Sequence, residues 1–118
     1  MKLVKYETAR KALSAATKVD EVKDIKDKAA ALAAYARQAR DTDLEMWSTE
    51  IKERAKRRLG EISRHLETAQ GANQHRPKAG KKLKADTLKA AGVSKSEAHR
   101  CEKLADMEEP VFEKRLAL

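Results

Sequence analysis

Residues 83–105, LKADTLKAAGVSKSEAHRCEKLA, decide the fold of the C-terminal part of this chain. They predict a short helix, a tight turn at Gly92 and a second helix. Gly92 stands where the first helix must stop, and only glycine takes the left-handed backbone conformation there without steric cost. Ser94 and Glu97 have the spacing of a capping box, in which a hydroxyl and a carboxylate each satisfy a backbone N–H at a helix start.

The side chains of this stretch divide into an inward and an outward set. Those expected to face inward, at the spacing that two crossed helices need, are Leu88, Val93, Ala98 and Cys101. Those left on the outer face of the second helix are Lys95, Ser96, His99, Arg100 and Lys103. This pattern is typical of a helix-turn-helix, whose second helix can lie in the DNA major groove. A small helical hairpin without a nucleic-acid role gives a similar string, and that alternative stays open.

The composition predicts an all-α protein with a thin core. The 118 residues include four Gly and two Pro, 3% are aromatic and 39% are charged, and helix formers dominate. A net charge of +8 favours a polyanionic partner, nucleic acid before an anionic membrane. No apolar run is long enough to span a bilayer, no signal-peptide core begins the chain, and the single cysteine suits a reducing cytoplasm.

The N-terminal part predicts two helices before residue 41. The first covers residues 3–17, with apolar positions every three or four residues. The second begins with Asp20 as its N-cap and runs to about Arg40. Its run KAAALAAYA has small side chains that let a neighbouring helix come close.

A long third helix is expected from Asp43 to Gln70, opened by a capping box of Thr42 and Glu45. At ~1.5 Å per residue it would be about 40 Å long, so it either pairs with the second helix as an antiparallel hairpin or forms a dimer interface. Gly60 marks a point where the helix bends or another backbone approaches. The apolar side chains that we assign to a dimer interface are Leu44, Trp47, Ile51, Leu59, Ile62 and Leu66.

Residues 71–82, GANQHRPKAGKK, have no periodicity and predict a flexible linker. From residue 71 to residue 85 there are five basic residues and no acid, which favours a basic arm that holds DNA phosphates. The predicted phosphate contacts are Arg76, Lys78, Lys81, Lys82, Lys84 and Lys103. A last short helix is expected from Pro110, covering the open side of the two-helix motif.

Two other groups of residues have plain explanations. The basic cluster of residues 52–58 is interpreted as a solvated face, with Glu50 paired to Arg54 and Glu53 to Arg57. Contact with the DNA backbone in a dimer–DNA complex is the alternative. The spacing of the three histidines and the cysteine matches no common zinc pattern, and no Ser, His and Asp set has a supporting signature. We therefore expect no metal, no cofactor, no catalytic residue and no enzyme activity.

Three strings carry a family resemblance. VDEVKDIKDKAAALAAYARQARDTDLE and EIKERAKRRLGEI resemble the N-terminal part of small proteins of prophages, plasmids and other bacterial mobile elements. The tail GVSKSEAHRCEKLADMEEPVFEKRL is similar to the helix-turn-helix of ParB-type partition proteins, although related motifs often have Trp where this chain has Cys101. The resemblance implies DNA binding and mobile-element biology. It does not extend to a partition protein's nucleotide-hydrolysing or clamp domain.

Together these patterns predict three parts: a dimerising helical bundle (1–70), a basic linker (71–82) and a helix-turn-helix (83–118). We expect a homodimeric regulator or accessory factor that binds duplex DNA in the bacterial cytoplasm, at the nucleoid. Its half-sites would lie about one DNA turn apart, or a multiple of it. The predicted base contacts are Lys95, Ser96, His99 and Arg100, with Arg100 bidentate to guanine. The alternatives are a helical adaptor for an unidentified protein partner and an antitoxin-like inhibitor.

Overall fold

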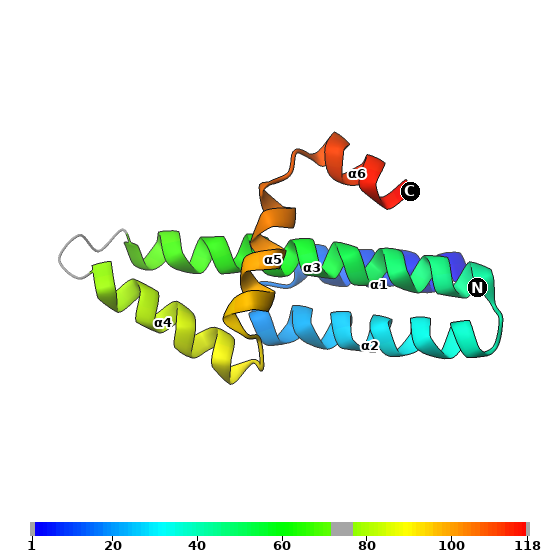
Figure 1. The fold of residues 1–118 in the computed structure, drawn as a ribbon, viewed down its shortest axis with the longest axis horizontal. Helices are drawn as coiled ribbons and strands as arrows, with labels where there is room; N and C mark the ends of the chain where they lie inside the picture. Colours follow the sequence, from blue (N-terminus) through cyan, green and yellow to red (C-terminus); the bar gives the residue numbers. More distant parts are fainter. Residues whose placement is uncertain (1, 72–76, 118) are drawn as a thin grey trace.

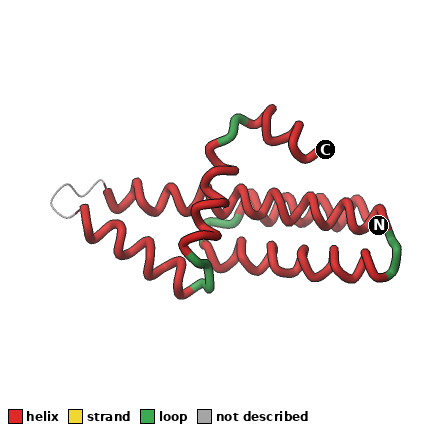
Figure 2. Tube along the Cα trace, viewed as in Figure 1, coloured by secondary structure: helices red, strands yellow, loops and turns green. Residues whose placement is uncertain are grey.

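Six helices make up the described part of the chain. The structure, a computed structural model, describes residues 2–71 and 77–117. No strand occurs in these two ranges (Figure 2), which confirms the predicted all-α class. The helices are α1 (Lys2–Ala15), α2 (Val19–Gln38), α3 (Thr42–Gly71), α4 (Pro77–Ala90), α5 (Lys95–Asp106) and α6 (Glu109–Ala117).

The helices α1, α2 and α3 lie side by side, with α2 antiparallel to the other two (Figure 1). Of the two roles left open for the long third helix, the structure has the antiparallel hairpin with α2. The alanines of α2 explain the close packing, because Ala29, Ala33 and Ala36 are all buried. Small side chains at these positions let the two helix backbones approach, as the sequence predicted.

The two predicted helix caps in this hairpin are wrong. Residue Lys18, with no side-chain cap, takes the N-cap position of α2, and Asp20 lies in the first turn instead. At the start of α3, Asp41 Oδ1 accepts a hydrogen bond from Leu44 N at 3.1 Å, and Asp41 O accepts one from Glu45 N. Asp41 therefore caps α3, and the helix begins one residue earlier than a cap at Thr42 would allow.

The inward face of α3 supplies the core of the single chain. Ile51, Leu59 and Ile62 are only 2%, 0% and 7% exposed, and Leu66 packs against the same cluster. Leu44 and Trp47 are half-buried, and the Trp47 ring lies 6.3 Å from that of Tyr6 in α1. The assignment of this face to a dimer interface is wrong for the three buried residues, because other helices of the same chain already cover them.

Helix α5 crosses α3 steeply near the middle of α3 (Figure 1), and Gly60 makes this crossing possible. A Cβ atom at residue 60 would overlap the carbonyl oxygen of Cys101 and lie 2.8 Å from the backbone nitrogen of Glu102. The backbones of α3 and α5 are therefore in direct contact. Of the two roles predicted for Gly60, the approach of another backbone is confirmed.

The two parts that the sequence suggested share one core. A single hydrophobic cluster contains Leu13 and Val22 of the N-terminal helices together with Leu88, Val93 and Cys101. Helix α4 also begins at Pro77, so residues 77–82 are helical and not part of a linker. Proline is favoured in the first turn of a helix because its missing N–H would have no helical partner there.

Candidate nucleic-acid interface

The turn between α4 and α5 has the predicted left-handed glycine and the predicted N-cap residue. Gly92 has a φ of 80°, and Val93 N donates to Leu88 O at 2.8 Å, which closes the end of α4. Ser94 is the N-cap of α5, and its Oγ accepts a hydrogen bond from Glu97 N at 3.1 Å. The reciprocal half of the capping box is replaced, because the Glu97 carboxylate pairs with Lys26 of α2.

The predicted inward and outward sets are also confirmed. Leu88, Val93, Ala98 and Cys101 are all buried, and burial raises the pKa of the Cys101 thiol. On α5, the exposed side chains form one face, because residues three, four and seven apart lie on the same side of a helix. This exposed face of α5 contains Lys95, Ser96, His99, Arg100 and Lys103, and the exposed Asp106, paired with Arg64 of α3, lies at its C-terminal end. The structure thus brings together every residue predicted to contact bases.

Of the predicted phosphate contacts, the structure describes the side chains of two, Lys84 and Lys103. Lys84 faces inward: its side chain is 15% exposed, and its Nζ lies 3.1 and 3.2 Å from the two carboxylate oxygens of Glu102. This pairing and the small exposed fraction of the side chain leave Lys84 poorly placed to hold a DNA phosphate. Lys103 is exposed on α5. Arg76 and the side chains of Lys78, Lys81 and Lys82 lie outside the described residues.

A buried polar network that the sequence did not reveal fixes α5 to its neighbours. Glu102 is buried, and one of its oxygens also accepts from Ser63 Oγ of α3 at 3.1 Å. Arg64 of α3 donates to both oxygens of Asp106 at 2.6 and 3.3 Å. A buried carboxylate is stable only when it is paired and hydrogen-bonded, so this network constrains where α5 sits. Its members are too far apart in sequence for a local pattern to signal them.

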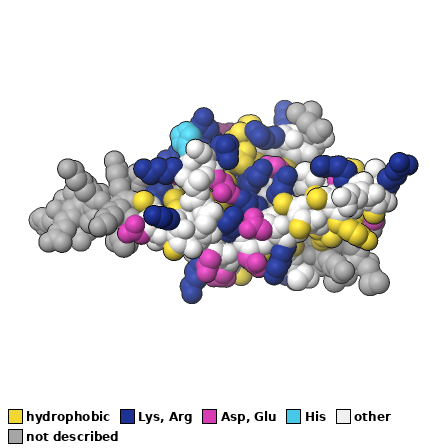
Figure 3. Space-filling model, turned by 60° about the horizontal axis from the view of Figure 1, so that its bottom comes forward, with side chains coloured by type: hydrophobic (Ala, Val, Ile, Leu, Met, Phe, Trp, Pro, Cys, Tyr) yellow, Lys and Arg dark blue, Asp and Glu magenta, His cyan; other side chains and the backbone are white. Residues whose placement is uncertain are grey.

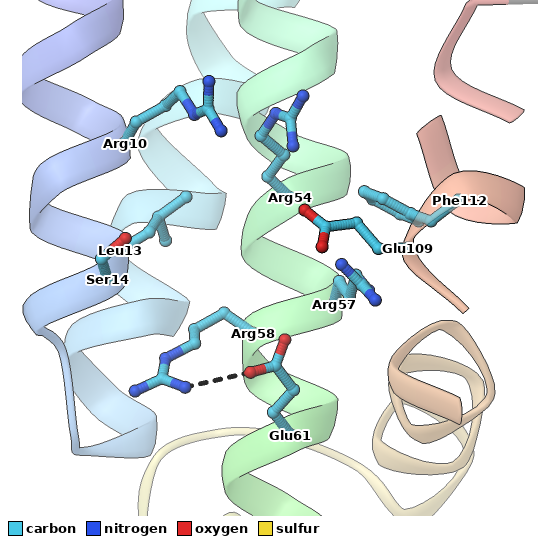
Figure 4. A pocket seen from close by; sticks show the side chains of 9 residues that line it. All are labelled: Arg10, Leu13, Ser14, Arg54, Arg57, Arg58, Glu61, Glu109 and Phe112. Carbon is cyan, nitrogen blue, oxygen red and sulfur yellow. Dashed lines mark hydrogen bonds and ion pairs between the residues drawn. The ribbon is translucent and has the colours of Figure 1, made fainter. Parts of the chain in front are cut away.

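The basic cluster of α3 is not the solvated face that the sequence predicted. Arg54, Arg57 and Arg58, together with Arg10 of α1, line a hollow of about 310 Å³ between α1, α3 and α6 (Figure 4). Arg58 donates to Ala16 O at 2.8 Å and pairs with Glu61 at 3.0 Å. The predicted pair of Glu50 with Arg54 is present at 3.3 Å. Glu53 pairs with Lys56 instead of Arg57.

These arginines hold α6 against α3. Arg57 donates to Met107 O at 3.1 Å, and its guanidinium lies 4.8 Å from the centre of the Phe112 ring. Arg54 forms a bidentate pair with Glu113 at 2.9 and 3.1 Å. Phe112 is buried, whereas Val111 is exposed. Helix α6 therefore docks on α3 and not on the open side of the two-helix motif, and the guanidinium groups of Arg54, Arg57 and Arg58 have internal partners.

The described residues contain no cluster of metal ligands and no membrane-spanning helix. No three His, Cys, Asp or Glu side chains described in the structure lie close enough together to hold a metal ion. None of the helices, within the residues described, is long and apolar enough to cross a membrane. Lys and Arg side chains are spread widely over the face drawn in Figure 3, with Asp and Glu among them.

Comparison with known proteins gives no relative from which a function could be inferred. No protein-family model, no curated protein and no solved structure matches the chain. The functional proposal therefore rests on the geometry and charge of α5 and its surroundings.

Proposed function

We propose that this protein binds duplex DNA sequence-specifically, with the exposed face of α5 in the major groove. The observation that carries the proposal is that Lys95, Ser96, His99, Arg100 and Lys103 share one exposed face of a capped helix. Major-groove reading needs a helix of this kind, fixed by its other face and free on the side that meets base edges. The role is that of a regulator or accessory factor without catalysis, acting at the bacterial nucleoid, in keeping with the resemblance to mobile-element proteins.

The packing of α5 supports this role. Ala98, Cys101 and Leu104 are buried against the rest of the chain, and Arg64 and Ser63 of α3 hold Asp106 and Glu102. A reading helix must keep its orientation when it enters the groove, since base contacts require donors placed to within a fraction of an ångström. None of the five exposed side chains takes part in this packing, so all are available to DNA.

The homodimer remains part of the proposal, but its interface must differ from the one expected. The inward face of α3 is used within the chain, so a second copy would have to pack on another surface. Sedimentation at micromolar concentration tests this part independently of DNA. A mass of one chain in the absence and presence of DNA removes the dimer and the paired half-sites from the proposal.

The DNA proposal is tested by selecting binding sites from a pool of random duplexes and titrating the selected site by fluorescence anisotropy. We expect Arg100→Ala to weaken binding to the selected site by roughly 1–3 kcal/mol and to reduce discrimination at one position, because a bidentate contact to guanine is lost. Lys114→Ala is the matched control, since Lys114 is an exposed cation that belongs to α6 and not to α5. It should bind the selected site like wild type.

Two results would overturn this proposal. One is the absence of any binding to duplex DNA even at low salt, and the other is binding without enrichment of any sequence. The alternative of a helical adaptor would then be favoured by one specific feature. A hollow of about 900 Å³ between α1, α3 and α6 is lined by Tyr6, Trp47, Leu116 and Met46, and Met46 is 72% exposed.

A further inference from the structure

A second basic hollow, of about 440 Å³, lies beside α5 on the side facing α2, α3 and α6. Three of its cations come from helices other than α5: Lys26 of α2, Lys56 of α3 and Arg115 of α6. Two more, Arg100 and Lys103, belong to the exposed face of α5. No stretch of the sequence brings these five residues together, and the fold alone makes them neighbours.

The charges in this hollow do not cancel. Glu97 pairs with Lys26, and Glu53 pairs with Lys56 at 3.2 Å. Arg100, Lys103 and Arg115 pair with no acidic group in the part of the chain that the structure describes. The pKa of Lys26 is lowered, first by burial and then by the nearby Lys23, with Lys56 acting in the same direction. The hollow is therefore a place where one more negative charge would be stabilised.

The position of the hollow relative to the exposed face of α5 fits DNA. A helix in the major groove has a phosphate backbone on each flank, because the groove is about 12 Å wide. The flank of α5 toward α4 is lined by Lys84, Lys95 and His99, and Lys84 is neutralised by Glu102. The opposite flank is the basic hollow. On that flank lie three cations that have no acidic partner in the described residues, namely Arg100 and Lys103 of α5 and Arg115 of α6, whereas on the described flank toward α4 the one such cation is Lys95.

We infer that the basic hollow binds a backbone phosphate of duplex DNA, with Arg115 of α6 and Lys103 of α5 as its principal donors. This inference rests on the proposed function. It assigns to α6 the role of placing Arg115 next to a phosphate at the edge of the major groove. A guanidinium suits this task because its planar donors match phosphate oxygens in pairs. Since a phosphate carries no sequence information, this contact sets affinity and orientation for every sequence alike.

The test compares Arg115→Ala with Lys114→Ala. Both variants remove one positive charge from neighbouring exposed positions of α6, but only Arg115 lines the hollow. Anisotropy is measured with a random-sequence duplex of about 20 base pairs, two turns of B-DNA, at salt concentrations from about 50 to 200 mM. We expect Arg115→Ala to weaken binding about five- to tenfold and to lower the salt slope by about one. Lys114→Ala should change affinity less than twofold.

A double variant separates a shared phosphate from independent effects. If Arg115 and Lys103 hold the same phosphate, Arg115→Ala combined with Lys103→Ala should weaken binding by less than the product of the two single effects. Equal behaviour of Arg115→Ala and Lys114→Ala, while the wild-type protein binds DNA, overturns this inference and leaves the proposed function standing. Absence of wild-type binding overturns both. Circular dichroism and thermal melting establish that each variant keeps its helices.

Discussion

Gly60 is the residue on which the arrangement of the whole molecule depends most directly. We predict that Gly60→Ala destabilises the protein by about 1–3 kcal/mol, because a methyl group there must displace the backbone of α5. The gain in helix propensity, at most about 1 kcal/mol, acts in the opposite direction and is smaller. Urea unfolding followed by circular dichroism measures the difference.

Lys52→Ala serves as the control for this substitution. Lys52 is a partly exposed residue of the same helix, and a change there should alter stability by less than about 0.5 kcal/mol. A Gly60→Ala variant that is more stable than wild type would contradict the close approach of α3 and α5.

At this scale the sequence predicted which side chains of α4 and α5 are buried, but not what pairs with the polar ones. The inward positions Leu88, Val93, Ala98 and Cys101 follow from helical spacing, which is a local property. Lys84 was expected to hold a phosphate and instead pairs with Glu102, eighteen positions away. Thr42 was a plausible cap, but Asp41 lies one residue earlier and its carboxylate reaches Leu44 N. When two neighbouring residues can both cap a helix, the sequence alone does not show which of them does so.

The attachment of α6 to α3 includes an ion pair, between Arg54 and Glu113, whose contribution depends on pH. The hydrogen bond from Arg54 lowers the pKa of the Glu113 carboxyl below its ordinary value. The contribution of this pair is therefore fully present above the ordinary pKa of about 4.5 and is lost as the pH falls through the lowered value in the folded protein. Because Glu113 is substantially exposed, we expect the contribution to be less than about 1 kcal/mol.

We predict that the stability difference between wild type and Glu113→Gln shrinks as the pH is lowered from 6 to about 3. Urea unfolding at each pH measures it. Glu108→Gln is the control, since Glu108 is an exposed carboxylate with no ion pair in the described residues. A difference that stays constant or grows on acidification would show that Arg54 and Glu113 are not paired.

The existence of α6 was predictable, and the surface on which it docks was not. Pro110 and the apolar residues after it indicate a helix, which begins at Glu109. Its buried Phe112 lies against Arg57 of α3, and an arginine in a charged sequence gives no local sign that it will stack on an aromatic ring. The same limit applies to the dimer interface assigned to α3. A periodic apolar pattern indicates that one face of a helix is buried, but it does not indicate which helix, of the same chain or of a second copy, covers that face.

For the molecule as a whole, a single core implies that α5 unfolds with the rest of the chain. The buried Cys101 reports on this, because it lies where α5 meets α3. We predict that a thiol reagent modifies Cys101 more than about 10³-fold more slowly in the native protein than in urea-unfolded protein at the same pH. Gly60→Ala should speed the native reaction about tenfold for each ~1.4 kcal/mol of stability that it removes.

The control for this experiment is a free thiol such as N-acetylcysteine, which corrects for the effect of urea on the reagent. Native labelling within tenfold of the unfolded rate would mean that α5 detaches on its own. That outcome would restore the division into an N-terminal bundle and a separate C-terminal motif, which the sequence suggested and the shared hydrophobic cluster argues against.

The exposed face of α5 also has a consequence for how the binding preference of this protein can evolve. Its outward side chains contribute nothing to the core, while Ala98, Cys101 and Glu102 on the opposite face are tied to α3 and α4. Substitutions at Lys95, Ser96, His99 and Arg100 are therefore nearly free of stability cost. Related chains can acquire new binding preferences there one residue at a time, whereas position 60 and the buried side of α5 must stay as they are.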